Sequence, residues 1–266
     1  MQPMLNIALR AARLASEQVQ HAQGKVEIIR SEKSEISELI EETAISAEKT
    51  IAYTIQKAFP NHALQGEYSG DYASAGSKTE ATWHMSAFDN LANFSNGVPQ
   101  IAICLAATIN GKIQHAVIIN PVTGEEFTAS RGYGAILNGR RIRVTDCKGL
   151  ENSTISTNFA DNSGDKGLLD KHLNMTAKLH ANRGILQNTG SAALNFASVA
   201  AGRIDGSYAD NLQIATTLAS ALLIQEAGGL AGDLNGEPNF KKSKSLATGN
   251  AKVFKALIQA VHHSAK

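Results

Sequence analysis

The chain has 266 residues, of which 43% are hydrophobic and 18% are charged, and its formal net charge at pH 7 is +1. This composition excludes a disordered chain, and the length is sufficient to bury a large core. A net charge so close to zero gives no global field for nucleic acid or membranes, so any such contact would need a local patch. The first arginine comes at position 10, and no apolar run approaches membrane-spanning length. We therefore expect a cytoplasmic protein with no signal peptide and no membrane contact.

Hydrophobic periodicity predicts alternating helices and strands along the chain. In chain order, the pattern predicts helices over 4–21 and 37–58, strands over 81–86, 101–109 and 113–119, a strand-turn unit over 126–145, a helix over 191–201, a strand over 204–209, and helices over 214–227 and 251–263. Asn110-Gly111 and Asn138-Gly139 are residue pairs typical of tight hairpin turns. We expect one domain over residues 1–266, with two tightly packed halves of about 1–145 and 146–266.

The segment from Ser31 to Thr50 has no glycine or proline and is dense in good helix formers, so we expect a fixed helix there. Apolar residues at helical spacing define one face of this helix, and glutamates define the other. The glutamates are Glu35, Glu38, Glu41, Glu42 and Glu48. A run of glutamates of this kind is either a solvated face or a surface for a partner, and the sequence leaves both open.

The most informative stretch is Trp83-His-Met-Ser-Ala-Phe-Asp-Asn-Leu-Ala-Asn-Phe94. It resembles the frame W-x-[IV]-D-P-[IL]-D-G-T-x-N-F of the inositol monophosphatase family. Further blocks that resemble the bacterial SuhB-like branch follow in the family's order, over residues 4–13, 101–107, 127–139, 190–194, 199–206 and 226–229. The resemblance covers nearly the whole chain. It implies an α/β fold, the layered α/β/α/β/α sandwich of the inositol monophosphatase and fructose-1,6-bisphosphatase-like sugar phosphatases.

The resemblance also implies which positions would perform phosphatase chemistry. In the family, the two Asp of the frame and a backbone carbonyl between them hold Mg²⁺, while the Thr helps to orient the attacking water. Here Ser86 replaces the first Asp, Asn90 the Gly and Leu91 the Thr. The Asp that works with this Thr aligns with Ala44, and the last metal carboxylate aligns with Thr216. We therefore expect that no catalytic group is intact.

Two carboxylates survive as possible metal ligands. Asp89 is the second Asp of the frame, and Glu67 matches the first Glu of the family's E-E-S-G segment, where Tyr68 replaces the second. Paired Mg²⁺ ions need several hard oxygen ligands, so these two remnants would hold at most one weakly bound ion. We expect no cofactor and no ordinary phosphatase activity. A structural alternative for Asp89 is to cap the helix that begins near Asn90.

A second segment matches the family's substrate pocket. Gly190, Ser191 and Ala192 align with backbone that contacts inositol, so they are candidates for substrate binding. Small residues at this point would equally allow a helix to pack closely against its neighbours. The sequence does not decide between a retained ligand role and a structural one.

Three arginines, Arg141, Arg183 and Arg203, are candidates for binding an anion. Surface ion pairing is the alternative for each. The two cysteines, Cys104 and Cys147, lie far apart in the sequence and give only weak grounds for a disulfide. Neither cysteine is paired with a histidine in a pattern that would indicate catalysis.

Two classes of function follow from the resemblance. The first is a catalytically impaired homologue that works by binding proteins. SuhB-like proteins form homodimers and join the Nus-factor machinery that supports transcription of ribosomal RNA, a role that needs no phosphatase chemistry. The second is an Mg²⁺-dependent phosphatase with residual or altered activity towards inositol-1-phosphate or a related sugar phosphate. We expect the first, with a homodimer and without a direct nucleic-acid signature in the sequence.

Overall fold

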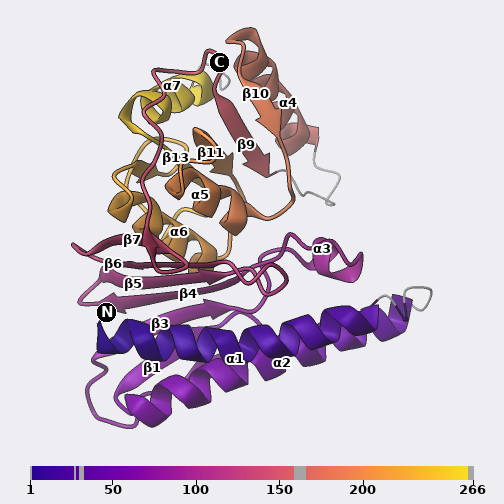
Figure 1. Ribbon diagram of the computed structural model, residues 1–266, viewed down its shortest axis with the longest axis vertical. Coiled ribbons are helices and arrows are strands. Elements are labelled where there is room, and N and C mark those ends of the chain that lie inside the picture. Colours follow the sequence, from indigo (N-terminus) through magenta and orange to yellow (C-terminus); the bar gives the residue numbers. More distant parts are fainter. Residues whose placement is uncertain (1, 27, 30–32, 159–165, 263–266) are drawn as a thin grey trace.

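The computed structural model describes residues 2–26, 28–29, 33–158 and 166–262. Its helices and sheets form successive layers (Figure 1). Helices α1 and α2 cover one face of an eight-stranded sheet, and α5 and α6 cover the other. A five-stranded sheet lies on the far side of α5 and α6, and α4 and α7 contact this second sheet. This arrangement confirms the α/β/α/β/α sandwich.

The eight-stranded sheet has the strand order β2-β1-β3-β4-β5-β6-β7-β8. Its strands are β1 (His62–Gly66), β2 (Gly70–Tyr72), β3 (Ala81–Ser86), β4 (Ile103–Ile109), β5 (Lys112–Ile119), β6 (Glu126–Ser130), β7 (Gly134–Leu137) and β8 (Arg140–Arg141). Strands β1 and β3 pair in parallel, and all other neighbours are antiparallel. Both predicted hairpin turns are present, with positive φ at Asn110-Gly111 and Asn138-Gly139. Strands β1 and β2 were not predicted.

Strand β4 lies in the middle of this sheet and is covered on both faces. Successive side chains of a strand point to opposite faces. Cys104 and Ala106 accordingly lie in the core shared with α5 and α6, whereas Ile103 and Leu105 lie in the core shared with α1 and α2. This explains why the segment reads as a continuous apolar run rather than an alternating one.

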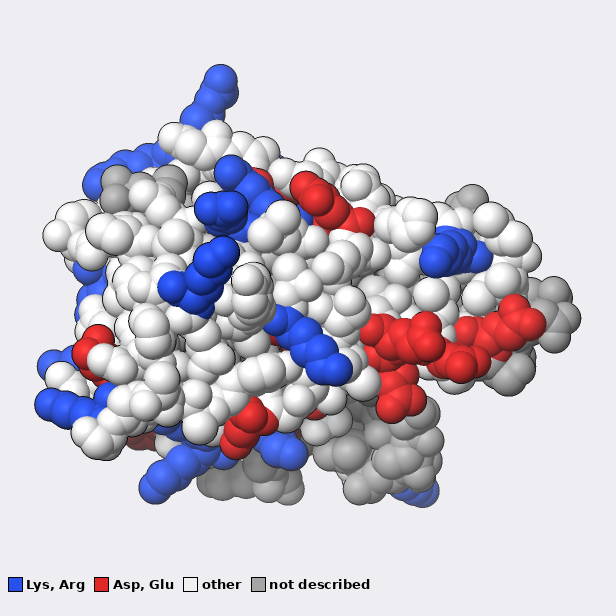
Figure 2. Space-filling model, turned by 90° about the horizontal axis from the view of Figure 1, so that it is seen from below, with Lys and Arg blue, Asp and Glu red and all other residues white. Residues whose placement is uncertain are grey.

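Helices α1 (Pro3–Val26) and α2 (Lys33–Ala58) pack along each other beneath the sheet. The helix expected over Ser31–Thr50 is therefore present from Lys33, while Ser31 lies outside the described residues. The exposed glutamates Glu35, Glu38, Glu41 and Glu42 lie in the first half of α2, and Figure 2 shows acidic side chains gathered towards one end of this face. The placement of Glu48 on the polar face was wrong, because its side chain is completely buried.

Helices α5 (Ala192–Ala200) and α6 (Ile214–Glu226) form the middle layer. Every α6 residue from Ala215 to Ile224 is buried, because the helix is enclosed by sheets on both sides. A helix in such a position is mostly apolar on all sides, and the polar side chains that α6 buries are those of Thr216, Thr217 and Ser220. Within the described residues, no helix is both long and apolar enough to cross a membrane.

The five-stranded sheet has the order β10-β9-β11-β13-β12. Its strands are β9 (Thr154–Asn158), β10 (Ile185–Gln187), β11 (Gly206–Ala209), β12 (Leu230–Gly232) and β13 (Leu246–Gly249), and its outer helices are α4 (Lys166–Ala181) and α7 (Ala251–His262). Periodicity predicted β11 and α7. It missed the other four strands, because strands of three to five residues leave little pattern, and it also missed the helix α4. The predicted last residue of α7, at position 263, lies outside the described residues.

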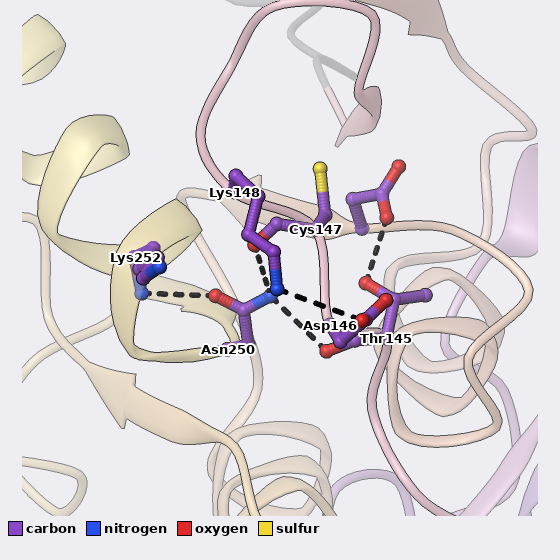
Figure 3. Close-up of polar contacts among 7 residues, drawn as sticks. Thr145, Asp146, Cys147, Lys148, Asn250 and Lys252 are labelled. Atoms are coloured by element: carbon purple, nitrogen blue, oxygen red, sulfur yellow. Dashed lines mark hydrogen bonds and ion pairs between the residues drawn. The ribbon is translucent and has the colours of Figure 1, made fainter.

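The segment that connects the two sheets is hydrogen-bonded to Asn250, the residue before α7 (Figure 3). The Asn250 side-chain amide donates to the backbone oxygens of Thr145, at 3.1 Å, and Cys147, at 2.8 Å, and its oxygen accepts from the Lys252 N–H. The Thr145 hydroxyl in turn donates to the Asp205 carboxylate at 2.7 Å. These contacts hold the connecting segment against the second sheet.

Candidate active site

The fold brings the family-like motifs together at one end of β3. Strand β1 pairs in parallel with β3, with Gly66 opposite Met85, so the loop after β1 lies beside the loop after Ser86. The Glu67 N–H donates to the Met85 carbonyl at 3.2 Å and fixes this proximity. The N-termini of α5 and α6 reach the same place from the middle layer, as the contacts of Asp89 and Ser86 below show.

Asp89 is the centre of the first cluster of contacts. Its Oδ1 accepts from the Ala102 N–H at 2.8 Å, and its Oδ2 accepts from the Ser191 hydroxyl at 2.5 Å and the Ala193 N–H at 3.1 Å. Burial raises the pKa of Asp89 to about 6, while these donors act in the opposite direction. The carboxylate is therefore ionised at neutral pH. Its hydrogen-bond donors come from the residue that precedes β4 and from the start of α5.

The helix cap proposed for Asp89 was wrong by one residue. Asn90 is the N-cap of α3 (Leu91–Ser95), and its Oδ1 accepts from the Asn93 N–H at 2.8 Å. Asn is as good an N-cap as Asp, so composition alone could not separate the two neighbours. Asp89 instead accepts a hydrogen bond from the Ala193 N–H, which lies in the first turn of α5.

Ser86 and Tyr68 form a second cluster with a residue that the sequence did not indicate, Gln213. The Ser86 hydroxyl lies 2.6 Å from the Gln213 Oε1 and 3.0 Å from the Phe88 carbonyl oxygen. The Tyr68 hydroxyl donates to the same Phe88 oxygen at 3.4 Å. Burial raises the pKa of Tyr68 to about 12, and its hydrogen bond with Gln213 opposes this rise. The phenol therefore keeps its proton and can act as a donor.

Glu67, the predicted metal-ligand remnant, lies beside the buried Glu48. Glu67 is exposed, and partial burial followed by repulsion from Glu48 raises its pKa. Glu48 is buried and accepts from the backbone N–H groups of Glu67, Tyr68 and Ser69, at 3.1, 3.0 and 2.8 Å, and from the Ser69 hydroxyl at 2.7 Å. Glu48 therefore shapes the loop after β1. An apolar helix face interrupted by one carboxylate was the only sequence signal for it.

The remaining aligned positions have no polar contacts suited to catalysis. Ala44 is completely buried in the core beneath the sheet, and Leu91 is 40% exposed at the start of α3. Thr216 is buried near the N-terminus of α6, and its hydroxyl has no hydrogen-bond partner among the described residues. Ala44 and Leu91 have no polar side-chain group, and the only side-chain polar group of the three is the neutral hydroxyl of Thr216.

The predicted substrate segment is in contact with the same cluster. The Asn90 Nδ2 donates to the Gly190 carbonyl at 2.5 Å, and Ser191 caps α5 by accepting from the Leu194 N–H. Gly190 has φ of +87°, and a Cβ added there would lie 2.7 Å from the Asn93 amide. The backbone around Gly190 is therefore covered by side chains of the α3 segment, and Ala192 is buried at the start of α5.

The residues at these positions do not fit a two-magnesium site. The Asp89 oxygens accept three hydrogen bonds, Ser86 offers a neutral hydroxyl, and hydroxyl groups approach the Phe88 carbonyl, which lies where the family uses a backbone ligand. Across the described ranges, no three His, Cys, Asp or Glu side chains come together in a way that could hold a metal ion. Mg²⁺ requires near-octahedral oxygen ligands and sheds water reluctantly, and this set does not meet that demand.

Comparison with known proteins gives consistent matches over nearly the full length. The model of the inositol monophosphatase family matches residues 1–266. The chain is 40% identical over 261 residues to the Nus factor SuhB of Pseudomonas aeruginosa, covering 98% of this chain and 96% of that protein. It is 33% identical to the Nus factor SuhB of Escherichia coli K12, covering 97% and 95%. The crystal structure of the extragenic suppressor protein suhB from Bartonella henselae superposes with a TM-score of 0.86 at 29% identity, covering 98% of each chain.

Proposed function

The chain belongs to the inositol monophosphatase family, and from that premise we propose that it is a catalytically impaired member that acts by binding proteins of the transcription machinery. The observation that carries this proposal is the Tyr68–Ser86–Gln213 cluster around the Phe88 carbonyl. In this cluster, neutral hydroxyl and amide groups stand where metal-dependent phosphoryl transfer requires anionic ligands around paired cations.

The geometry supports the loss of catalysis in two independent ways. Without carboxylates at Ser86 and Thr216, the charge of paired Mg²⁺ ions would not be balanced. Without polar groups at Ala44 and Leu91, the attacking water would not be oriented, and a positioned acid or base group typically contributes on the order of 10²–10⁴ in rate. A chain that lacks both the metal ligands and the water-orienting groups keeps the fold of the family but not its phosphatase activity.

A role in transcription is supported by the relatives. Proteins that share 33–40% of their residues with this chain over nearly its whole length are named Nus factors. A protein that acts by binding other proteins needs a suitable outer surface, whereas it does not need metal ligands inside the site. Substitution of buried metal ligands is compatible with it, and so is a cytoplasmic location.

A homodimer is part of the same proposal, and the free edge of the five-stranded sheet is the surface we assign to it. Strand β10 is the outermost strand, and Ile185 on it is 59% exposed. On the neighbouring helix α4, Leu173 is 53% exposed. An edge strand with exposed apolar side chains is a surface that proteins commonly cover by pairing. A second copy of this chain would cover it symmetrically.

The proposal is tested by capture of the tagged chain from its own host at native expression level, with identification of co-purifying chains. We expect RNA polymerase subunits and Nus factors to be enriched over a capture with the tag alone. The same preparation should not hydrolyse inositol-1-phosphate with Mg²⁺. Turnover by the purified chain, with no transcription protein enriched, would contradict the proposal and support the sugar-phosphate phosphatase alternative.

A further inference from the structure

The three arginines that the sequence marked as candidates for anion binding differ in their surroundings. Arg203 forms an ion pair with Glu125 at 2.5 Å, and Arg183 forms one with Glu151 at 3.3 Å. Arg141 has no acidic partner among the described residues, and its Nη2 donates to the backbone oxygen of Tyr133 at 3.0 Å. Only Arg141 therefore keeps a charge that is not neutralised by a carboxylate.

Two more arginines near Arg141 are held in the same way. The Arg131 Nε donates to the Ile113 carbonyl at 2.6 Å, and the Arg143 Nη1 donates to the Ile142 carbonyl at 3.0 Å. Both side chains are exposed, and neither has an acidic partner within the described part of the chain. A guanidinium has five N–H donors and no acceptor, so each arginine retains donors that point elsewhere. Anchoring on a carbonyl reduces the rotamer freedom that binding would otherwise have to remove.

Tyr133 lies on the turn between β6 and β7, two residues after Arg131, and its carbonyl accepts from Arg141. Its side chain is 61% exposed. The flanking Gly132 and Gly134 have φ of +79° and +86°, and their N–H groups donate to the Glu226 carboxylate at 2.8 and 2.7 Å. Glu226 is thus occupied by the backbone of the turn rather than by the guanidinium groups. Its carboxylate fixes the turn that presents the aromatic ring.

We call Arg131, Tyr133, Arg141 and Arg143 the basic edge. Arg141 contacts the Tyr133 carbonyl, and Arg143 approaches the backbone oxygen of Glu226 at 3.5 Å. Arg131 precedes Tyr133 by two residues and donates to Ile113. Along the chain, Arg131 and Tyr133 lie in the turn after β6, Arg141 lies on the outermost strand β8, and Arg143 lies two residues beyond it. Arg140 on β8 and Lys112 at the start of β5 are also exposed.

We propose that the basic edge binds single-stranded nucleic acid. Guanidinium groups with free donors suit successive phosphates, because they can form bidentate, charge-assisted hydrogen bonds with them. An exposed tyrosine ring offers a surface on which an unpaired base can stack, and groove-like combinations of cations and aromatic rings are typical of sequence-tolerant single-strand binding. A duplex would leave Tyr133 without a base to stack on. The near-neutral net charge does not oppose this local field, which acts within about a Debye length of the edge.

The test uses fluorescence anisotropy of a labelled twelve-nucleotide uridine RNA with the full chain. Replacement of Arg131, Arg141 and Arg143 by Gln is compared with a control that removes the same charge from the α1–α2 layer, in which Lys25, Lys49 and Lys57 become Gln. We expect the arginine variant to lose at least about tenfold in affinity and the lysine variant to lose less than about twofold. Since each phosphate contact contributes about −0.7 to the slope of log affinity against log salt, the slope should become less negative by about 2 in the arginine variant.

The tyrosine has its own matched control. Tyr133→Ala should weaken binding by about tenfold, the effect expected for loss of one stacked base. Tyr53→Ala, on α2 at 68% exposure, should leave it unchanged. An RNA duplex of equal length should bind more weakly than the single strand. Thermal midpoints establish that the variants are folded.

Three results would overturn the proposal. The first is an absence of salt-dependent binding by the native chain. The second is an equal loss of affinity in the arginine and lysine variants. The third is competition by a polyglutamate peptide as effective as that by unlabelled RNA, together with no effect of Tyr133→Ala, which would assign the basic edge to an acidic protein. The outcome is independent of the proposed transcription partners, because the assay contains only this chain and RNA.

Discussion

The Asp89 carboxylate and the Ser191 hydroxyl lie 2.5 Å apart, although 102 positions separate them in the sequence. Asp89 follows the eight-stranded sheet's β3, and Ser191 caps α5 in the middle layer. The carboxylate that the family uses for a metal therefore joins two layers of this protein. Its retention has a structural explanation that requires no cation.

Asp89→Asn should destabilise the fold by about 2–3 kcal/mol at pH 7.5. The amide would replace one acceptor by a donor that faces the Ser191 hydroxyl and the Ala193 N–H, leaving buried groups unsatisfied. For a chain of this length, the thermal midpoint should fall by roughly 5–10 °C. The control is Asp146→Asn, because Asp146 has a fully exposed side chain. An unchanged midpoint in Asp89→Asn would show that the contact contributes nothing.

Glu48→Gln tests whether the loop after β1 depends on one buried carboxylate. Gln keeps a single carbonyl oxygen for the three N–H groups and the hydroxyl that Glu48 accepts, so we expect a loss of about 2–3 kcal/mol in the free energy of unfolding. Hydrogen exchange at residues 67–69 should become faster. Glu42→Gln, on the exposed face of the same helix, should change neither quantity.

His62 gives the fold a pH dependence of known sign. Its Nδ1 accepts from the Trp83 indole N–H at 3.1 Å, which requires a neutral ring, and burial lowers the pKa of His62 below its ordinary value of 6.5. The unfolded chain therefore takes up this proton first as the pH falls. The contribution of His62 to stability should be complete above about pH 6.5 and should decline as the pH falls towards the lowered pKa.

The variant His62→Asn provides the comparison for that pH dependence. The Asn side-chain oxygen can accept from the Trp83 indole N–H, and the Asn side chain has no titratable group. Urea unfolding of both proteins between pH 7.5 and 5 should give a difference in free energy that shifts in favour of His62→Asn as the pH falls. The comparison of the two proteins is needed because Asp89 titrates in the same pH range. Burial raises the pKa of Asp89 to about 6, so the contribution of Asp89 to stability increases as the pH falls, whereas that of His62 decreases. If the difference in unfolding free energy between the two proteins did not vary with pH, His62 would have the same pKa in the folded and the unfolded chain.

The proposed dimer can be tested at the free edge of the five-stranded sheet. Leu173→Glu combined with Ile185→Glu should convert a particle of twice the chain mass into a monomer of 28.2 kDa in light scattering. A charge buried in a symmetric contact is present twice and is strongly unfavourable. Leu230→Glu, on β12 at the opposite edge and 45% exposed, should leave the dimer intact. A dimer that survives the double substitution would place the interface elsewhere.

The long elements and the family frame could be predicted from the sequence, whereas the contacts that define the site could not. Periodicity identified α1 and α2 because buried residues recur along them at helical spacing. Helix α6, whose residues from Ala215 to Ile224 are all buried, was predicted as well. The altered site positions assigned from the frame between Trp83 and Phe94 stay a prediction. Gln213 escaped notice because its partner, Ser86, is 127 positions away and nothing in its local sequence distinguishes it. The cap at Asn90 was missed because two adjacent residues were equally good candidates.

Calorimetric titration of the native chain with Mg²⁺ tests the central claim most directly. A functional two-metal site would give saturable heat at millimolar Mg²⁺ and, by linkage, a rise in thermal midpoint that grows with metal concentration. The altered ligands at Ser86 and Thr216, together with the hydrogen bonds that occupy Asp89, lead us to expect only the heat of dilution. Saturable binding of Mg²⁺ accompanied by hydrolysis of inositol-1-phosphate would contradict the account.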